Sequence, residues 1–260
     1  MVAYLRLLAR VAATAARRSL AGWPVALSVF LYAAILVAAG MLFGRLGLAG
    51  GFILGFVEAA CVSGYLYLLS VVVSGSRLAW GDVRDGFLAL LWDVIGVLFF
   101  LWLASFGVEA LIRMAGPHGE AVGAGWGLIV AIFLNPIPEL IYQRRAPGRT
   151  VDRLVASARF VQDHWIEWFV PNLLFGVALL GLVFGAGAYQ ARFLIIALPS
   201  LFSLEGAFQL APALLGRGDA LWVAPLVLAL CHYAMVFRGL LFQEIARGGW
   251  RARALRDAWR

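Results

Sequence analysis

The stretch ARFLIIALPSLFSLEGAFQLAPALLGRG, residues 191–218, decides how many times this chain crosses a membrane. It is apolar enough to enter hydrocarbon, but Pro199 and Pro212 interrupt it, and Glu205 and Gln209 lie inside it. Its leucine, isoleucine and phenylalanine side chains favour insertion by about 0.3–0.6 kcal/mol each, whereas a central acid costs about 2.5–3.5 kcal/mol. Hydropathy alone therefore leaves the stretch near balance, and the charges elsewhere in the chain must decide.

The composition of the whole chain indicates a membrane protein. Of its 260 residues, 63% are hydrophobic and 13% are charged, whereas a soluble domain is about 25% charged. Several apolar runs approach the roughly 20 residues that a helix needs to cross the hydrocarbon layer. The runs lie at 24–43, 52–73, 90–112, 123–142, 168–189 and 221–242. This pattern predicts an all-α polytopic protein with about six transmembrane helices, folded as a single integral membrane domain over residues 1–260.

The arginines predict the orientation. Eleven of the 21 arginines precede the first run or lie in the loops after the second and fourth runs, which share one side. The opposite loops hold Arg45, Arg113 and Arg192. Because positive residues concentrate in cytoplasmic loops, the N-terminus should be cytoplasmic. Five arginines follow residue 243, and Arg238 lies near the end of the last run. The C-terminus should therefore be cytoplasmic too, which requires an even number of crossings. We therefore expect 191–214 to be a re-entrant or interfacial element on the outer side, with a seventh span as the alternative.

Three tryptophans suggest an internal repeat. Trp23, Trp92 and Trp165 are spaced by 69 and 73 residues, and each follows a short charged segment and opens an apolar run. Tryptophan favours the membrane interface, which supports a unit of surface helix, tryptophan anchor and two-span hairpin, although any interface attracts tryptophan. The predicted cytoplasmic amphipathic helices are 2–20, 77–88 and 150–164. The repeat units would be 1–74, 75–147 and 148–260.

The charge distribution also limits the partners. The net charge is +7, and the arginines lie in short loops beside apolar runs. This favours contact with the lipid bilayer and its anionic headgroups, and a protein partner on the cytoplasmic face, over nucleic acid. Cys61 and Cys231 lie inside apolar runs without histidine or cysteine neighbours at metal-ligand spacing. We expect no metal, no cofactor and no catalytic residue.

Acidic residues inside the apolar runs are the main functional signal, because a buried charge in hydrocarbon is costly unless it is paired or neutral. Glu58, Glu109 and Glu205 lie toward the predicted outer side, where Arg45 and Arg113 follow in loops. Together these residues could line an outward-facing polar pocket. The alternative is that they reach the surface and form one structural ion pair.

The fourth run ends in NPIPEL, residues 135–140, which predicts a break in its helix. Asn135 could bond a carbonyl freed by Pro136 or Pro138, and Glu139 would face the basic loop that follows. A kinked helix with its break satisfied is one interpretation, and a gating hinge at these four residues is the other. Asp93, directly after Trp92, should pair with a nearby arginine at the cytoplasmic surface.

Two segments carry a family resemblance. SGYLYLLSVVVSGSRLAWGDVRDGF (63–87) and LVASARFVQDHWIEWFVPNLL (154–174) resemble bacterial six-span membrane proteins of the DUF4013 and glycerophosphodiesterase-membrane-domain type. The resemblance covers about 60–180. It implies an integral scaffold or accessory role in the bacterial inner (plasma) membrane, and carries no catalytic residue across.

A second resemblance is architectural. A surface helix, six spans and a re-entrant element in a chain of 260 residues are similar to an ABC-2-type permease subunit, which would move a lipid-like or hydrophobic substrate with a separate ATPase. We expect a non-enzymatic accessory or scaffold subunit first, such a permease second and an intramembrane enzyme third.

Overall fold

The computed structural model describes residues 2–143, 148–185 and 224–248. Within these ranges every regular element is a helix, and five helices are long and apolar enough to cross a membrane. These are Trp23–Phe43, Gly47–Ser74, Leu91–Met114, Gly116–Tyr142 and Pro225–Ala246. The prediction of an all-α polytopic membrane protein is thus confirmed. The predicted run at 168–189 is not among the five, and 191–214 lies outside the described residues.

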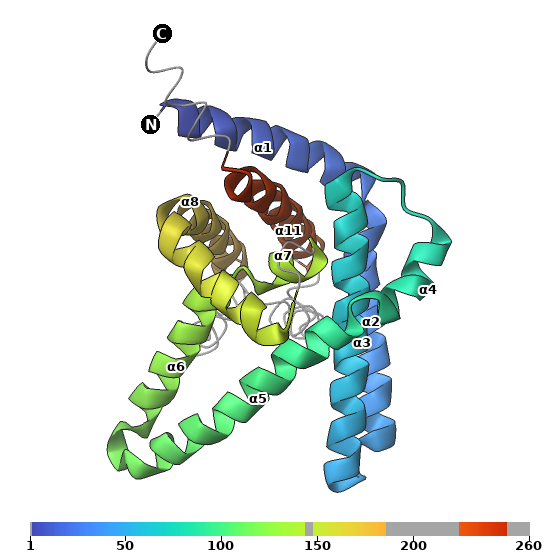
Figure 1. Cartoon of the computed structure of the whole chain (residues 1–260). Helices are drawn as coiled ribbons and strands as arrows, with labels where there is room; N and C mark the ends of the chain where they lie inside the picture. Colours follow the sequence, from blue (N-terminus) through green and yellow to red (C-terminus); the bar gives the residue numbers. More distant parts are fainter. Residues whose placement is uncertain (1, 144–147, 186–223, 249–260) are drawn as a thin grey trace.

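The chain begins with a helix that lies across a hairpin. Helix α1 (Val2–Ala21) crosses the upper ends of α2 (Trp23–Phe43) and α3 (Gly47–Ser74), which run side by side (Figure 1). Gly22 lies at the corner between α1 and α2. A Cβ at this position would lie 2.5 Å from Cγ2 of Val72, so the close contact requires glycine. The absence of a side chain at this corner allows α1 to leave α2 at a steep angle while staying against α3.

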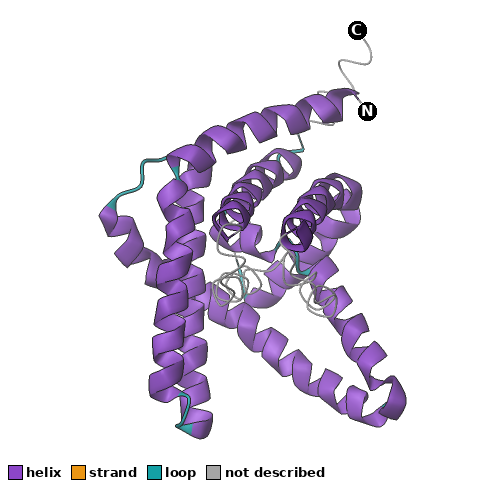
Figure 2. Cartoon of the chain, turned by 180° about the vertical axis from the view of Figure 1, so that it is seen from behind, coloured by secondary structure: helices purple, strands orange, loops and turns teal. Residues whose placement is uncertain are grey.

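A second hairpin diverges from the first. It follows α4 (Trp80–Ala89) and consists of α5 (Leu91–Met114), the short turn η1 (Gly116–His118) and α6 (Gly119–Phe133), with α7 (Ile137–Tyr142) after the break. Figures 1 and 2 show the tips of the α2–α3 and α5–α6 hairpins well apart. Only 6% of the apolar window of α5 is buried, against 56% for α3. Helix α5 of the second hairpin therefore exposes most of its apolar side chains on the surface of the protein, as expected of a helix that faces lipid.

The last part of the chain contains α8 (Thr150–Gly185) and α11 (Ala224–Ala246). At His164 the backbone of α8 is not helical, with φ −136° and ψ 24°, so α8 consists of two segments that meet there. In the described part of the chain, a shorter helix is followed by a longer one at three places: α1 by α2, α4 by α5, and the first segment of α8 by its second. The longer helices begin near Trp23, Trp92 and Trp165, respectively. The repeat units expected at 1–74, 75–147 and 148–260 stay a prediction.

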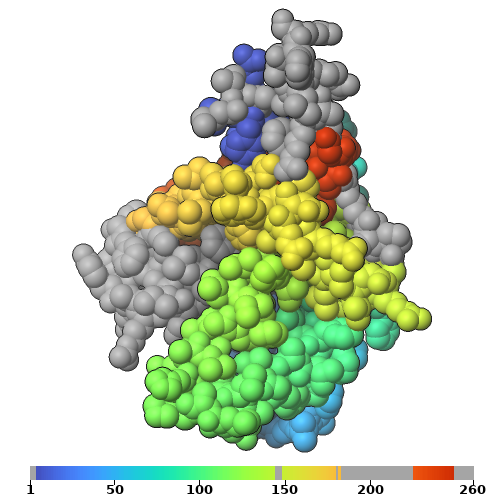
Figure 3. Space-filling view, turned by 60° about the vertical axis from the view of Figure 1, so that its left-hand side comes forward, coloured from blue at the N-terminus to red at the C-terminus, as the bar shows by residue number. Residues whose placement is uncertain are grey.

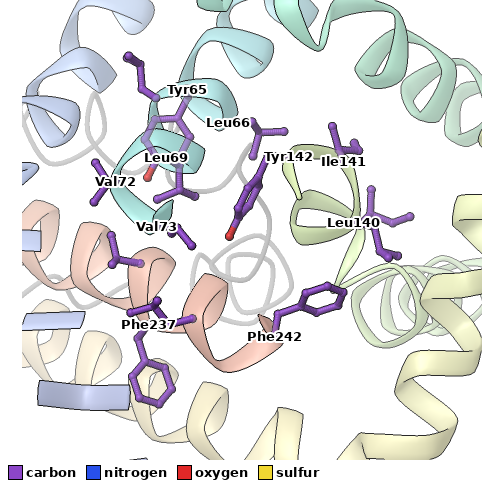
Figure 4. Packing of buried hydrophobic residues seen from close by; sticks show 14 of the residues in the cluster. Tyr65, Leu66, Leu69, Val72, Val73, Leu140, Ile141, Tyr142, Phe237 and Phe242 are labelled. Carbon is purple, nitrogen blue, oxygen red and sulfur yellow. The ribbon is translucent and has the colours of Figure 1, made fainter. Parts of the chain in front are cut away.

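The core lies where the ends of three helices meet. Figure 4 shows Leu66, Leu69 and Val73 of α3 facing side chains of α7 and α11. All three are at most 1% exposed. From the other helices, Tyr142 and Phe242 point into the same space. The well-packed end of the molecule is therefore the one crossed by α1, and the hairpins diverge from it.

Helix α4 lies differently from the surface helix that the sequence suggests at 77–88. It begins at Trp80, after a non-helical connection, and runs obliquely along α3 rather than across its end (Figure 1). The buried hydroxyl of Ser63, in the middle of α3, explains this placement. It donates to the carbonyl of Gly86 at 2.8 Å and accepts from the backbone N–H of Leu90 at 3.0 Å. These bonds hold the α4–α5 junction against the middle of α3.

Candidate functional site

The described members of the expected outer pocket do not gather in one place. Glu109 pairs with Arg113 on its own helix at 2.8 Å, with side chains 57% and 74% exposed. Glu58 is half-buried in the first half of α3, and Arg45 is exposed in the loop before it. Both belong to the first hairpin, whose tip lies apart from the tip of the second hairpin (Figure 1). Glu205 lies outside the described residues.

The predicted break in the fourth run is present. Residues 134–136 form a turn between α6 and α7, and Pro136 and Pro138 lie at the start of α7, where a missing N–H costs no helical hydrogen bond. Asn135 bonds differently from the expectation, because its side-chain oxygen accepts a hydrogen bond from the indole N–H of Trp168 at 2.8 Å. The break is thus tied to α8.

Glu139 does not face the basic loop, which corrects the sequence-based expectation. Its side chain is 0% exposed and lies against Arg238 of α11. The guanidinium Nε donates to Oε1 at 2.9 Å, and Nη2 donates to Oε2 at 3.1 Å. The planar fork of arginine matches the two carboxylate oxygens, and such two-bond pairs are among the stronger hydrogen-bonded contacts in proteins.

Further groups complete this buried site. Nη2 of Arg238 also donates to the backbone carbonyl of Asn135 at 2.8 Å. The guanidinium carbon lies 5.1 Å from the centre of the Trp168 ring, within range of a cation–π interaction. Asn172, one turn after Trp168, donates to the Trp168 carbonyl at 2.7 Å. The arginine therefore joins α7, α8 and α11 at one point.

The chemistry of this site favours a positioning role. A buried ion pair contributes little net stability, because desolvation offsets the attraction, but loss of one partner is costly. Both charges here are satisfied by the other and by neighbouring groups, so the pair specifies which helix ends meet. Transport proteins also place functional charges in ion pairs inside their apolar spans.

A second polar contact ties α8 to the second hairpin. Arg153 donates to Asp93 at 2.7 Å, which confirms the expected pairing of Asp93 with an arginine. One turn on, the hydroxyl of Ser157 donates to the carbonyl of Phe133 at 2.6 Å, at the end of α6. This bond satisfies one of the carbonyls that a helix leaves open where it ends.

His232 is a buried polar residue of α11. It is 4% exposed, and its imidazole lies against the backbone of Ser19 on α1. The side-chain hydroxyl of Ser19 has no hydrogen-bond partner among the described residues. Ser63, the buried serine of α3, bonds to the α4–α5 junction and not to His232.

Sequence reasoning missed three residues of the buried site, namely Trp168, Asn172 and Arg238. Arg238 was counted as one of the cytoplasmic arginines at the end of the last run, and Trp168 lay close to the exposed Trp165. The sequence did contain a usable signal: Glu139 and Arg238 each lie inside an apolar run and carry opposite charges. A buried acid at position 139 needs a cation from elsewhere in the chain.

A comparison of the chain with protein-family models, curated proteins and solved structures finds no match. The function must therefore be argued from the geometry alone.

Proposed function

We propose that this chain is a non-enzymatic integral membrane scaffold or accessory subunit of the bacterial inner membrane, with α1 as its cytoplasmic docking face. The division of α1 into two sides carries the proposal. Leu7, Val11 and Ala15 are at most 5% exposed. The exposed basic residues of the helix are Arg6, Arg10 and Arg17. Their spacing of four and seven residues places these arginines on one side of the helix.

The attachment of α1 supports a fixed docking face rather than a free arm. The hydroxyl of Tyr4 donates to the carbonyl of Glu167 in α8 at 3.0 Å. The carbonyl of Ala12 accepts from the hydroxyl of Tyr233 in α11 at 3.3 Å. At its other end, the guanidinium of Arg18 donates to the carbonyl of Val73 in α3. The helix is thus bonded to three others, and its arginines keep a fixed spacing.

Anionic headgroups and an acidic protein surface are the partners that fit this face. Each arginine near a membrane surface adds about 1 kcal/mol of attraction to anionic lipid. The repeat tryptophans Trp23, Trp92 and Trp165 are 58%, 73% and 60% exposed. Exposed tryptophan next to arginine is typical of protein at headgroup depth. A scaffold held in this way would offer the arginines to a partner at the membrane surface.

A permease subunit remains the second candidate, and the break at 134–136 is the observation that favours it. Broken helices beside buried charges recur in transporters. Here, however, Asn135 and Glu139 are both held by groups on other helices. A gating hinge at Asn135, Pro136, Pro138 and Glu139 would need these contacts to separate during each cycle, which favours the scaffold.

Photo-cross-linking in the source bacterium tests the scaffold. A benzophenone amino acid at Ala13, on the exposed side of α1, should give a discrete protein adduct that mass spectrometry identifies. The same probe at Leu103, which is 52% exposed on α5, should give only lipid adducts. Replacing Arg6, Arg10 and Arg17 with glutamine should abolish the protein adduct. Lipid adducts alone at both positions would contradict a scaffold, and an ATPase captured at Ala13 would favour the permease.

A further inference from the structure

An open groove lies between the first segment of α8 and the ends of α7 and α11. Its volume is about 580 Å³. Its floor is apolar and includes Leu140, Phe160 and Phe242, with the rings of Phe160 and Phe242 4.7 Å apart. Figure 3 shows α8, in yellow, lying between α1 and the α5–α6 hairpin on this side of the molecule.

The rim of the groove is charged. Asp152 and Asp163 contribute two carboxylates, and Arg159 contributes one guanidinium, all from the exposed side of α8. His164, at the bend of α8, also lines the groove. With a neutral imidazole the rim carries a net charge of −1, so it favours an occupant that is basic as well as apolar.

The chain itself supplies such an occupant at the edge of the groove. Ala246 is both the last residue of α11 and part of the groove lining. Gly248 follows with φ 62° and donates its N–H to the carbonyl of Ile245 at 2.9 Å, a left-handed turn that ends the helix. The remaining residues, 249–260, read GWRARALRDAWR. They combine four arginines with Trp250, Leu255 and Trp259.

We propose that residues 249–260 dock in this groove of their own chain. Their apolar side chains cover the floor, and their arginines meet Asp152 and Asp163. Twelve residues reach about 18 Å as a helix or about 40 Å when extended, enough to follow the first segment of α8. Because the segment starts at the groove edge, its tether gives it an effective concentration that a separate molecule rarely reaches.

Two anionic surfaces would compete for binding of the C-terminal arginines. The groove carboxylates attract them from within the protein, and anionic headgroups attract them from the bilayer. The groove therefore competes with the membrane for this segment.

Cross-linking at matched positions tests the proposal. In full-length protein with Cys61→Ala and Cys231→Ala, reconstituted in neutral-lipid nanodiscs, we pair Leu255→Cys with either Ala156→Cys or Ala158→Cys. Ala156 lines the groove. Ala158 is equally half-buried, but two positions along a helix amount to about 200°, so it lies on nearly the opposite side. A short bismaleimide should link 255 to 156 within one chain several-fold faster than 255 to 158.

Three results would overturn docking: equal rates at the two positions, no link at either, or a link formed only between differently tagged copies. A charge variant adds a second measurement. Asp163→Lys should slow the 156–255 link several-fold, whereas Asp85→Lys, on the exposed side of α4, should leave the rate unchanged. An unchanged rate with Asp163→Lys would show that the carboxylate does not hold the segment.

Discussion

Arg238 of α11 and Glu139 of α7 are 99 residues apart in the sequence and form a two-bond ion pair with side chains 4% and 0% exposed. Such a pair forms only when the ends of the two helices lie side by side. It therefore couples the break after α6 to the last helix, and Trp168 brings α8 to the same point.

Removing one partner of this pair should strongly destabilise the protein. We expect Arg238→Met to lower the free energy of unfolding by about 3–5 kcal/mol, because Glu139 is left as a buried, unpaired charge. The double variant Glu139→Met with Arg238→Met should recover most of the loss. Thermal unfolding in detergent, followed by tryptophan fluorescence, gives the comparison. Arg113→Met, which breaks the exposed pair with Glu109, should cost at most about 1 kcal/mol.

Loss of the hydrogen bonds from Ser63 to the α4–α5 junction should also destabilise the protein. Ser63→Ala leaves the buried N–H of Leu90 without its acceptor, which should cost about 1–3 kcal/mol. Hydrogen exchange should speed up across residues 80–90, where α4 loses its attachment to α3. Ser70→Ala is the matched control, since Ser70 bonds to the carbonyl of Tyr67, one turn back on its own helix. Equal exchange in both variants would contradict this role of Ser63.

Gly239 makes room for Tyr142 in the core. A Cβ at position 239 would collide with the Tyr142 hydroxyl and lie 2.8 Å from Cγ2 of Val73. Gly239→Ala should therefore destabilise the protein by about 1–3 kcal/mol, and adding Tyr142→Phe should restore part of the loss. Gly55→Ala, which meets nothing within 4 Å, should be neutral or slightly stabilising. Melting of the four proteins in one detergent measures these effects.

Tyr4 should make stability depend on alkaline pH. Burial, and then the charge of Glu167, raises the pKa of Tyr4 to about 12 from 10.0. Between these values the unfolded chain loses the phenol proton before the folded one does, so stability falls as pH rises through this window and is unaffected below it. Melting between pH 9 and about 12 should show a steeper decline for the native protein than for Tyr4→Phe. Parallel curves would contradict this linkage.

The sequence predicted the helical class and most helix positions because these depend on local hydropathy. The run predicted at 24–43 is α2 at Trp23–Phe43, and the break after Phe133 follows from Pro136 and Pro138. The bend at His164, between surface segment and apolar run, agrees with the end expected for the segment at 150–164. In each case a few neighbouring residues suffice.

Contacts between distant residues could not be predicted in the same way. A single sequence shows that Glu139 needs a partner, but several arginines were available, and the positive-inside rule assigned Arg238 to the membrane surface. Likewise, nothing local to α4 reveals that Ser63, in the middle of α3, holds its end. The grouping of Glu58 with Glu109 was based on shared depth in the membrane, which does not by itself bring residues of two hairpins together.

The side of the membrane on which the chain ends is the remaining test of the topology. The contact of Tyr233 with Ala12 brings α11 against α1, and Figure 1 shows the last turn of α11 at the end of the molecule crossed by α1. We therefore expect both termini in the cytoplasm, with six crossings and no crossing by 191–214.

In a protein with Cys61→Ala and Cys231→Ala, Arg45→Cys should react with an impermeant maleimide in intact spheroplasts. Leu5→Cys and Leu255→Cys should react only after permeabilisation. Labelling of position 255 but not position 5 in intact spheroplasts would require an odd number of crossings, make 191–214 the seventh span and place the groove and residues 249–260 on opposite sides of the membrane.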